Sequence, residues 1–202
     1  MARFLTIILV AGAPTAWGQC VEAVTHDGGR VVLFESGLRV HADSAWSGLR
    51  SGDRVVSATD RFAVHVPPGW RVEPPTGEML QGEFLLIREV DGLYVSPAFV
   101  EVADPSQVVP LAQALVAEVF SSFVLDGGPA DGIGVGPIRR TSLDGRLVIM
   151  RSFRGGEGEG TFSVAAISAP SGIVLVIGLS PRPVTEADWD EMVRRVEIVD
   201  PR

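Results

Sequence analysis

The chain of 202 residues is 46% hydrophobic and 21% charged, which excludes a wholly disordered protein and fits one globular domain with a small appendage. All 17 basic residues are arginine, the formal net charge is −8, and the pI is about 4.9. General nucleic-acid binders and proteins of anionic membrane surfaces are basic, so neither class fits this chain.

Residues 1–18 are predicted to be a signal peptide. Arg3 gives a basic start, and residues 4–11 form an apolar core far shorter than the roughly 20 residues that span a bilayer. Small residues at Ala16 and Gly18 suit cleavage after Gly18. We therefore expect a periplasmic or secreted protein, with no membrane span in the mature chain.

Cys20 lies just after the predicted cleavage site. A lipid anchor there is disfavoured, because Gln19 stands where a lipoprotein signal requires a small residue. The chain has no second cysteine, so neither an internal disulfide nor a metal site built from cysteines is expected.

Residues 19–58 are predicted to form a strand-rich extension. Residues 29–35 and 38–42 indicate a short β-hairpin with its turn at Ser36–Gly37, and residues 54–58 indicate a further short strand.

Residues 59–202 are predicted to form the main domain, whose strands are joined mostly by short turns that suit antiparallel neighbours. The expected strands cover residues 61–66, 83–90, 93–102, 138–142, 146–153, 161–168 and 173–179. Pro97 predicts a bulge or an edge position in its strand. The strand at 173–179 is apolar on both faces, which is typical of a central strand covered on both sides.

Two helices are expected in this domain. Asp104–Pro105 begins the first, whose regular part is expected from Pro110 and whose apolar stripe continues to Phe123. Thr185 begins the second, with Asp188 at the capping-box position, and residues 196–199 predict a closing edge strand. Strands and helices do not alternate along the chain, so one antiparallel sheet of the α+β class is favoured over a parallel sheet.

Residues 61–70 (RFAVHVPPGW) resemble the opening strand of the PsbP-like superfamily, in which an alternating strand ends in a valine, proline, any residue, glycine and tryptophan. The turn at residues 143–145, the strand at 172–179 and the helix with Trp189 are similar to that family too, so the resemblance covers residues 60–199. It implies an antiparallel sheet packed between helices, an α/β/α sandwich. Known members include a photosystem II extrinsic subunit, a Ran-binding nuclear import factor and exported bacterial proteins. The resemblance implies binding or assembly roles and supplies no common catalytic residues.

The residues that most often carry chemistry are scattered. His26, His41 and His65 lack metal-ligand spacing, although His41 and Asp43 share a strand face that suits at most a weak site. The chain contains no nucleophile elbow of the Gly-x-Ser-x-Gly type, and its glycine-rich runs are followed by strands or loops instead of a helix N-terminus. We therefore expect no enzyme, no cofactor and no metal.

Partner binding has two sets of candidate residues. Trp70 is either an anchor for a partner or a core residue, and the turn before it favours the core. Four arginines of the predicted sheet suit a basic patch for a carboxylate or phosphate group, although solvated strand positions are the simpler interpretation. They are Arg139, Arg140, Arg151 and Arg154.

The leading prediction is an exported, non-catalytic protein that binds another protein or supports an assembly of the bacterial envelope. The first alternative is a carrier of a small molecule or lipid, with a cavity between the helix at 104–123 and the sheet. The second alternative is a hydrolase whose site is assembled from distant residues.

Overall fold

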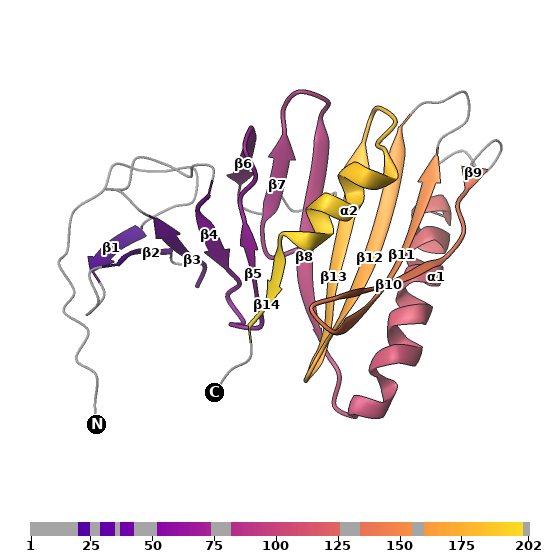
Figure 1. Cartoon of the computed structure of the whole chain (residues 1–202), viewed down its shortest axis with the longest axis horizontal. Coiled ribbons are helices and arrows are strands. Elements are labelled where there is room, and N and C mark those ends of the chain that lie inside the picture. Colours follow the sequence, from indigo (N-terminus) through magenta and orange to yellow (C-terminus); the bar gives the residue numbers. More distant parts are fainter. Residues whose placement is uncertain are drawn as a thin grey trace.

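The computed structural model describes residues 20–24, 29–34, 37–42, 52–73, 82–125, 134–154 and 160–199. These residues form antiparallel strands and two helices, which confirms the α+β class (Figure 1). The predicted signal peptide lies outside the described residues. Among the described helices, none is both long and apolar enough to cross a bilayer.

The strands build two sheets, so the expectation of one sheet is wrong. The larger sheet has the order β10-β11-β12-β13-β8-β7-β6, with β9 also paired to β11. Its strands are β6 (Trp70–Glu73), β7 (Leu85–Arg88), β8 (Leu93–Glu101), β9 (Gly134–Val135), β10 (Arg139–Leu143), β11 (Arg146–Arg154), β12 (Thr161–Ala169) and β13 (Gly172–Ser180). The short strand β6 was not expected from the sequence.

The smaller sheet has the order β1-β2-β3-β4-β5-β14 and lies beside the larger one (Figure 1). Its strands are β1 (Cys20–Val24), β2 (Arg30–Phe34), β3 (Arg39–Ala42), β4 (Arg54–Val56), β5 (Phe62–His65) and β14 (Val196–Ile198). Pairing of β4 with β5 crosses the predicted domain boundary at residue 58.

Residues 67–69 separate the two sheets along the chain. Pro67 and Pro68 interrupt the strand, and Gly69 has a φ of 75°, a left-handed conformation that glycine adopts without strain. The chain therefore leaves the smaller sheet after β5 and enters the larger one at β6. As a result, the predicted opening strand of the main domain lies in the smaller sheet, whereas β6 to β13 lie in the larger one.

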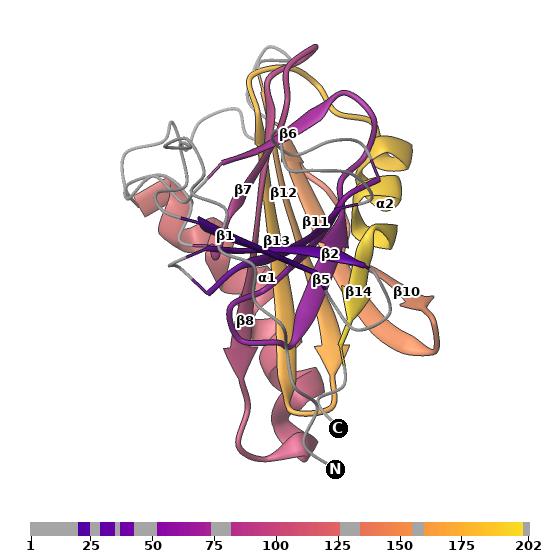
Figure 2. The ribbon, with the colours of Figure 1, turned by 90° about the vertical axis from the view of Figure 1, so that its left-hand side faces the viewer.

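Helix α1 (Val108–Leu125) covers one face of the larger sheet, and helix α2 (Glu186–Arg194) covers the other together with the smaller sheet (Figure 2). The side chains of β13 alternate between the two cores: Ile173 and Leu175 face α1, whereas Val174 and Val176 face α2. The prediction of a central strand buried on both faces is confirmed.

The first helix has the Asp104–Pro105 cap that its sequence predicts, but its regular part begins at Val108 and not at Pro110. Asp104 accepts a hydrogen bond from the backbone of Ser106 at 2.9 Å, and a single 3₁₀ turn, η1 (Pro105–Gln107), leads into α1. Pro110 lies in the first turn of α1, where a missing backbone donor breaks no intrahelical hydrogen bond.

Pro97 does not mark an edge or a bulge, because β8 lies between β13 and β7 and its register with β13 runs unbroken through Pro97. The carbonyl of Pro97 accepts from the backbone of Glu83, beyond the end of the β7 ladder. The missing N–H of the proline therefore falls where pairing with β7 has already ended.

Candidate functional site

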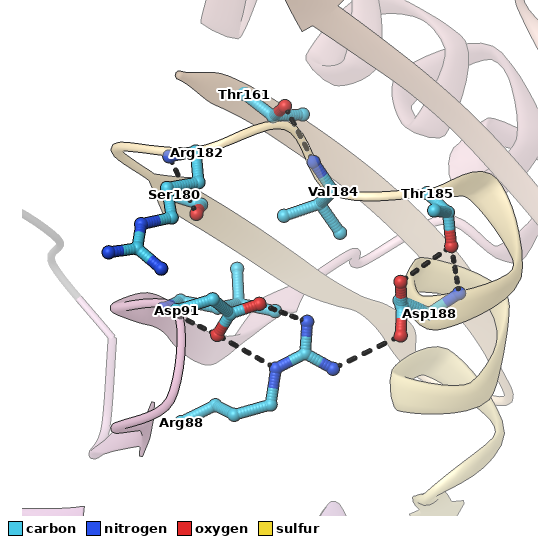
Figure 3. A network of polar contacts seen from close by, with 9 residues as sticks. Arg88, Asp91, Thr161, Ser180, Arg182, Val184, Thr185 and Asp188 are labelled. Atoms are coloured by element: carbon cyan, nitrogen blue, oxygen red, sulfur yellow. Dashed lines mark hydrogen bonds and ion pairs between the residues drawn. The ribbon is translucent and has the colours of Figure 1, made fainter. Parts of the chain in front are cut away.

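Arg88 on β7 ties the turn before β8 to the first turn of α2 (Figure 3). Its guanidinium donates to the two carboxylate oxygens of Asp91 at 2.9 and 2.5 Å, and to Asp188 at 3.2 Å. The guanidinium also lies 5.5 Å from the ring centroid of Trp70, a cation–π arrangement. The hydrogen bonds from Arg88 hold the pKa of Asp91 below its ordinary value.

The N-terminus of α2 is capped as the sequence predicts. The hydroxyl of Thr185 accepts from the backbone of Asp188 at 3.1 Å and donates to its carboxylate at 2.5 Å. That hydroxyl contact and the one from Arg88 keep the pKa of Asp188 low. In the preceding connection, the backbone of Val184 donates to the hydroxyl of Thr161 (Figure 3). The end of this connection that leads into α2 is therefore fixed by the hydroxyls of Thr161 and Thr185.

Arg139 on β10 is a second arginine that forms ion pairs with α2. Its guanidinium lies 2.7 Å from the carboxylate of Asp190 and 3.2 Å from that of Glu186. The hydrogen bond to Asp190 raises the pKa of Arg139. Helix α2 is thus tied to the larger sheet by one arginine from β7 and one from the edge strand β10.

A second polar group lies on the smaller sheet. The guanidinium of Arg54 on β4 donates to both carboxylate oxygens of Glu197 on β14, at 2.7 and 2.8 Å. His65 on β5 lies 3.2 Å from the same carboxylate. The hydrogen bonds from Arg54 are the main cause of a lowered pKa at Glu197. These bidentate contacts tie β4 to β14 across β5.

These polar groups do not form a metal centre. Within the described ranges, no three His, Cys, Asp or Glu side chains converge on one point. The arginine beside Glu197 also makes that carboxylate a poor ligand for a cation. His26 and Asp43 lie outside the described residues, whereas His41 lies on β3, so the predicted weak site of His41 with Asp43 is described only at His41.

Glu83, which precedes β7, is a half-buried carboxylate. It accepts from the backbone of Ala58 at 2.7 Å and from the hydroxyl of Thr59 at 3.2 Å. Burial raises the pKa of Glu83 despite these hydrogen bonds. Its contacts join the turn after β4 to the larger sheet, which is a structural role.

The structure places Trp70 against the core. Its half-buried ring packs on the cluster between the two sheets, and the guanidinium of Arg88 lies over it. This is the core interpretation that the preceding turn favours.

The four arginines named above do not form a single patch. Arg139 pairs with Met150 and faces α2, whereas Arg140 pairs with Ile149 and faces α1. Arg151 lies on the α1 face and donates to the carbonyl of Gly136 at 2.9 Å. Arg154 is exposed at the far end of β11, on the face opposite Arg151. Only Arg139 and Arg140 share the edge strand, and a role in partner binding remains a prediction for all of them.

Strand β10 is the outermost strand of its side of the larger sheet. It pairs with β11 on one side, and its three central residues, 140–142, are exposed. The turn to β11 has two residues with positive φ, Asp144 at 50° and Gly145 at 78°, which is the geometry of a tight hairpin. The other long side of β10 has no paired strand among the described residues.

Sequence reasoning missed Arg54, Glu197 and Arg88 as organising residues. Arg54 and Glu197 are 143 positions apart, so no local pattern links them. The capping-box pattern did identify Asp188 as a structural residue, but not its ion pair with Arg88, 100 positions away.

Comparison with known proteins identifies the fold. No family model and no curated protein matches the chain. Among solved structures, cyanobacterial PsbP from Synechocystis matches with a TM-score of 0.55 and 15% identity, over 78% of this chain and 98% of that one.

Two further structures match with lower TM-scores. LpqN of Mycobacterium tuberculosis, a protein involved in cell envelope biogenesis, gives 0.42 at 14% identity, over 69% of this chain and 83% of its own. A protein of Bacteroides thetaiotaomicron gives 0.41 at 11% identity, over 74% of this chain and 49% of that one. The match to cyanobacterial PsbP agrees with the resemblance at residues 61–70, and the chain has a PsbP-like fold.

Proposed function

We propose that this protein is an exported, non-catalytic binding protein of the bacterial envelope that acts by contact with another protein. This proposal depends mainly on the edge strand β10, which has exposed side chains and one long side that no described strand pairs with. Exposed strand edges are templates for pairing with other chains. The signal-peptide pattern at residues 1–18 supports export.

The ionisable groups support a binding role because they are used to hold the fold together. Arg88, Arg139 and Arg54 each join elements that are distant in sequence. His65 shares the carboxylate of Glu197 with Arg54 and has no serine beside it in the described contacts. A hydrolase with a dispersed site would instead need a base directed at a nucleophile.

The carrier alternative gains no support from the described part of α1. Val108, Ala112 and Val116 are buried directly against side chains of β11, β12 and β13, among them Ile149 and Val164. A bound lipid would have to separate these packed side chains.

The proposal is tested by expressing the full chain with a C-terminal tag in its native host, followed by fractionation and affinity capture after mild cross-linking. The expected result is a chain processed at its N-terminus, found in the envelope fraction, and captured with one partner protein in comparable amount. An unprocessed chain in the cytoplasm, or a processed chain without any partner, would overturn the proposal.

A further inference from the structure

We propose that β10 binds an extended, acidic segment of the partner protein as an additional strand of the larger sheet. This inference rests on the proposed function and specifies where contact occurs and which chemistry the partner brings. It depends on the direction of the backbone groups of β10 and on the charge of its side chains.

The hydrogen bonds of β11 show which residues of β10 face outward. The backbone of Leu147 donates to Ser168 on β12, and the carbonyl of Ser152 accepts from Gly136 beside β9. Even-numbered residues of β11 therefore direct their backbone groups toward β9 and β10, because this direction alternates along an antiparallel strand.

The even-numbered residues 146, 148 and 150 pair with residues 143, 141 and 139 of β10. The strand β11 therefore forms hydrogen bonds with the backbone groups of Leu143, Thr141 and Arg139. Arg140 and Ser142 lie between them and direct their N–H and C=O groups to the side on which no described strand pairs with β10. An extended segment lying along this side would meet two donors and two acceptors at strand spacing.

The side chains of β10 favour an acidic partner. Arg140 is exposed, and no carboxylate among the described residues lies within ion-pair distance of it. Arg139 beside it carries a second positive charge, although Asp190 and Glu186 engage that charge. In a chain of net charge −8, Arg140 is therefore the residue that gives this edge a positive charge without a described carboxylate beside it. An acidic residue opposite Arg140 would form a favourable cross-strand pair.

Apolar side chains extend the surface toward β9. Val135 is 45% exposed and Ile138 is 46% exposed, and they are two of the five most exposed large hydrophobic side chains of the described chain. A partner segment with apolar residues beside its acidic ones would cover them. A second copy of this chain fits less well, because β10 (Arg139–Leu143, RRTSL) contains no acidic residue that could pair with Arg140.

The direct test uses the full mature chain and a synthetic eight-residue peptide, capped at both ends, with two adjacent aspartates flanked by threonine and valine. Binding is measured by NMR, which follows the backbone amides of β10. The expected result is saturable binding that shifts the amides of Arg140 and Ser142 and slows their hydrogen exchange. The peptide with asparagines in place of the aspartates, and the peptide methylated on alternate backbone nitrogens, are expected to bind at least roughly tenfold more weakly.

Two variants of the protein test charge and backbone separately. Arg140→Glu reverses the exposed charge, and Ser142→Pro removes an outward N–H while leaving the bonds to β11 in place. Each is expected to weaken peptide binding at least roughly tenfold. Arg182→Glu is the matched control, since Arg182 is exposed on the connection before α2, and it is expected to bind as the wild type does (Figure 3). Circular dichroism and thermal unfolding confirm that each variant is folded.

The outcomes separate this inference from the proposed function. Two results overturn the inference about β10 and leave the proposed function standing. In the first, the peptide binds, but Arg140→Glu and Ser142→Pro do not weaken its binding. In the second, the peptide does not bind, and a partner captured from the envelope cross-links to residues away from β10. Dimerisation through β10 in place of peptide binding also overturns it. Failure to capture any partner overturns the proposed function, whatever the peptide does.

Discussion

Gly178 on β13 leaves room for the ring of Trp189, the largest side chain with which α2 enters the core. A Cβ added at Gly178 would lie 2.5 Å from one ring carbon of Trp189 and 3.0 Å from the next. Trp189 is only 1% exposed, so the ring has no free space into which it could move. We therefore predict that Gly178→Ala displaces α2 from the larger sheet and destabilises the fold.

The magnitude follows from two opposing effects. Overpacking a dense core costs about 1–3 kcal/mol, whereas replacing a strand glycine by alanine returns about 0.5–1 kcal/mol. We expect the free energy of unfolding to fall by roughly 1–2 kcal/mol, which lowers the urea midpoint by roughly 0.5–1 M for a protein of this size. Tryptophan fluorescence during urea unfolding measures the shift.

Gly134→Ala on β9 is the matched control, because the nearest atom to its added Cβ lies 3.9 Å away. This variant is expected to unfold at or slightly above the wild-type midpoint. In a Trp189→Phe background, the smaller ring relieves the clash, so Gly178→Ala is expected to cost less than it does alone. An unchanged urea midpoint for Gly178→Ala would refute the packing of the Trp189 ring against Gly178. The same loss of stability in both backgrounds would refute it too.

Three further predictions concern charge and the β10 edge. Glu197→Gln is expected to lower the free energy of unfolding at neutral pH. This difference should vanish as the pH falls through the lowered pKa of Glu197, since the carboxylate stabilises the fold only while ionised; a loss that persists in acid would contradict it. Glu83→Gln is expected to do the opposite. Burial raises the pKa of Glu83 and its ionised form costs stability, so the variant should be more stable at neutral pH, with a gain that shrinks as the pH falls through the raised pKa. Urea unfolding against pH measures both, and no gain at neutral pH would count against the second. In the free protein, the amides of Arg140 and Ser142 should exchange hydrogen faster than that of Thr141, which NMR measures, and uniform exchange along β10 would disprove the register.

The parts of the fold that the sequence predicted are those encoded by local patterns. The strand of β13 is apolar on both faces, and Thr185 with Asp188 marks the start of α2, so short-range chemistry identifies each one. The division into two sheets is different. The alternation in residues 61–66 predicts a strand, but it contains no information on which sheet the strand joins, because pairing with β4 and β14 is non-local.

The candidate site was predictable only in part, for the same reason. Arg139 and Arg140 are adjacent in one strand, so strand geometry alone places them on opposite faces and argues against one patch of four arginines. The partners of Arg139 on α2 lie about fifty positions along the chain and become neighbours only when α2 packs on the sheet. The open side of β10 likewise follows from its position in the strand order, which no local pattern gives.

Contact between the partner and β10 can be measured in the intact native envelope by site-specific photo-cross-linking. A photoreactive amino acid is placed at Ser142 on the open edge or, as the control, at Arg182 on the connection before α2. We expect one discrete adduct from position 142, joined to an acidic segment of another protein, and no such adduct from position 182. Adducts from position 182 alone, or none from position 142 in cells that contain the partner, would contradict it.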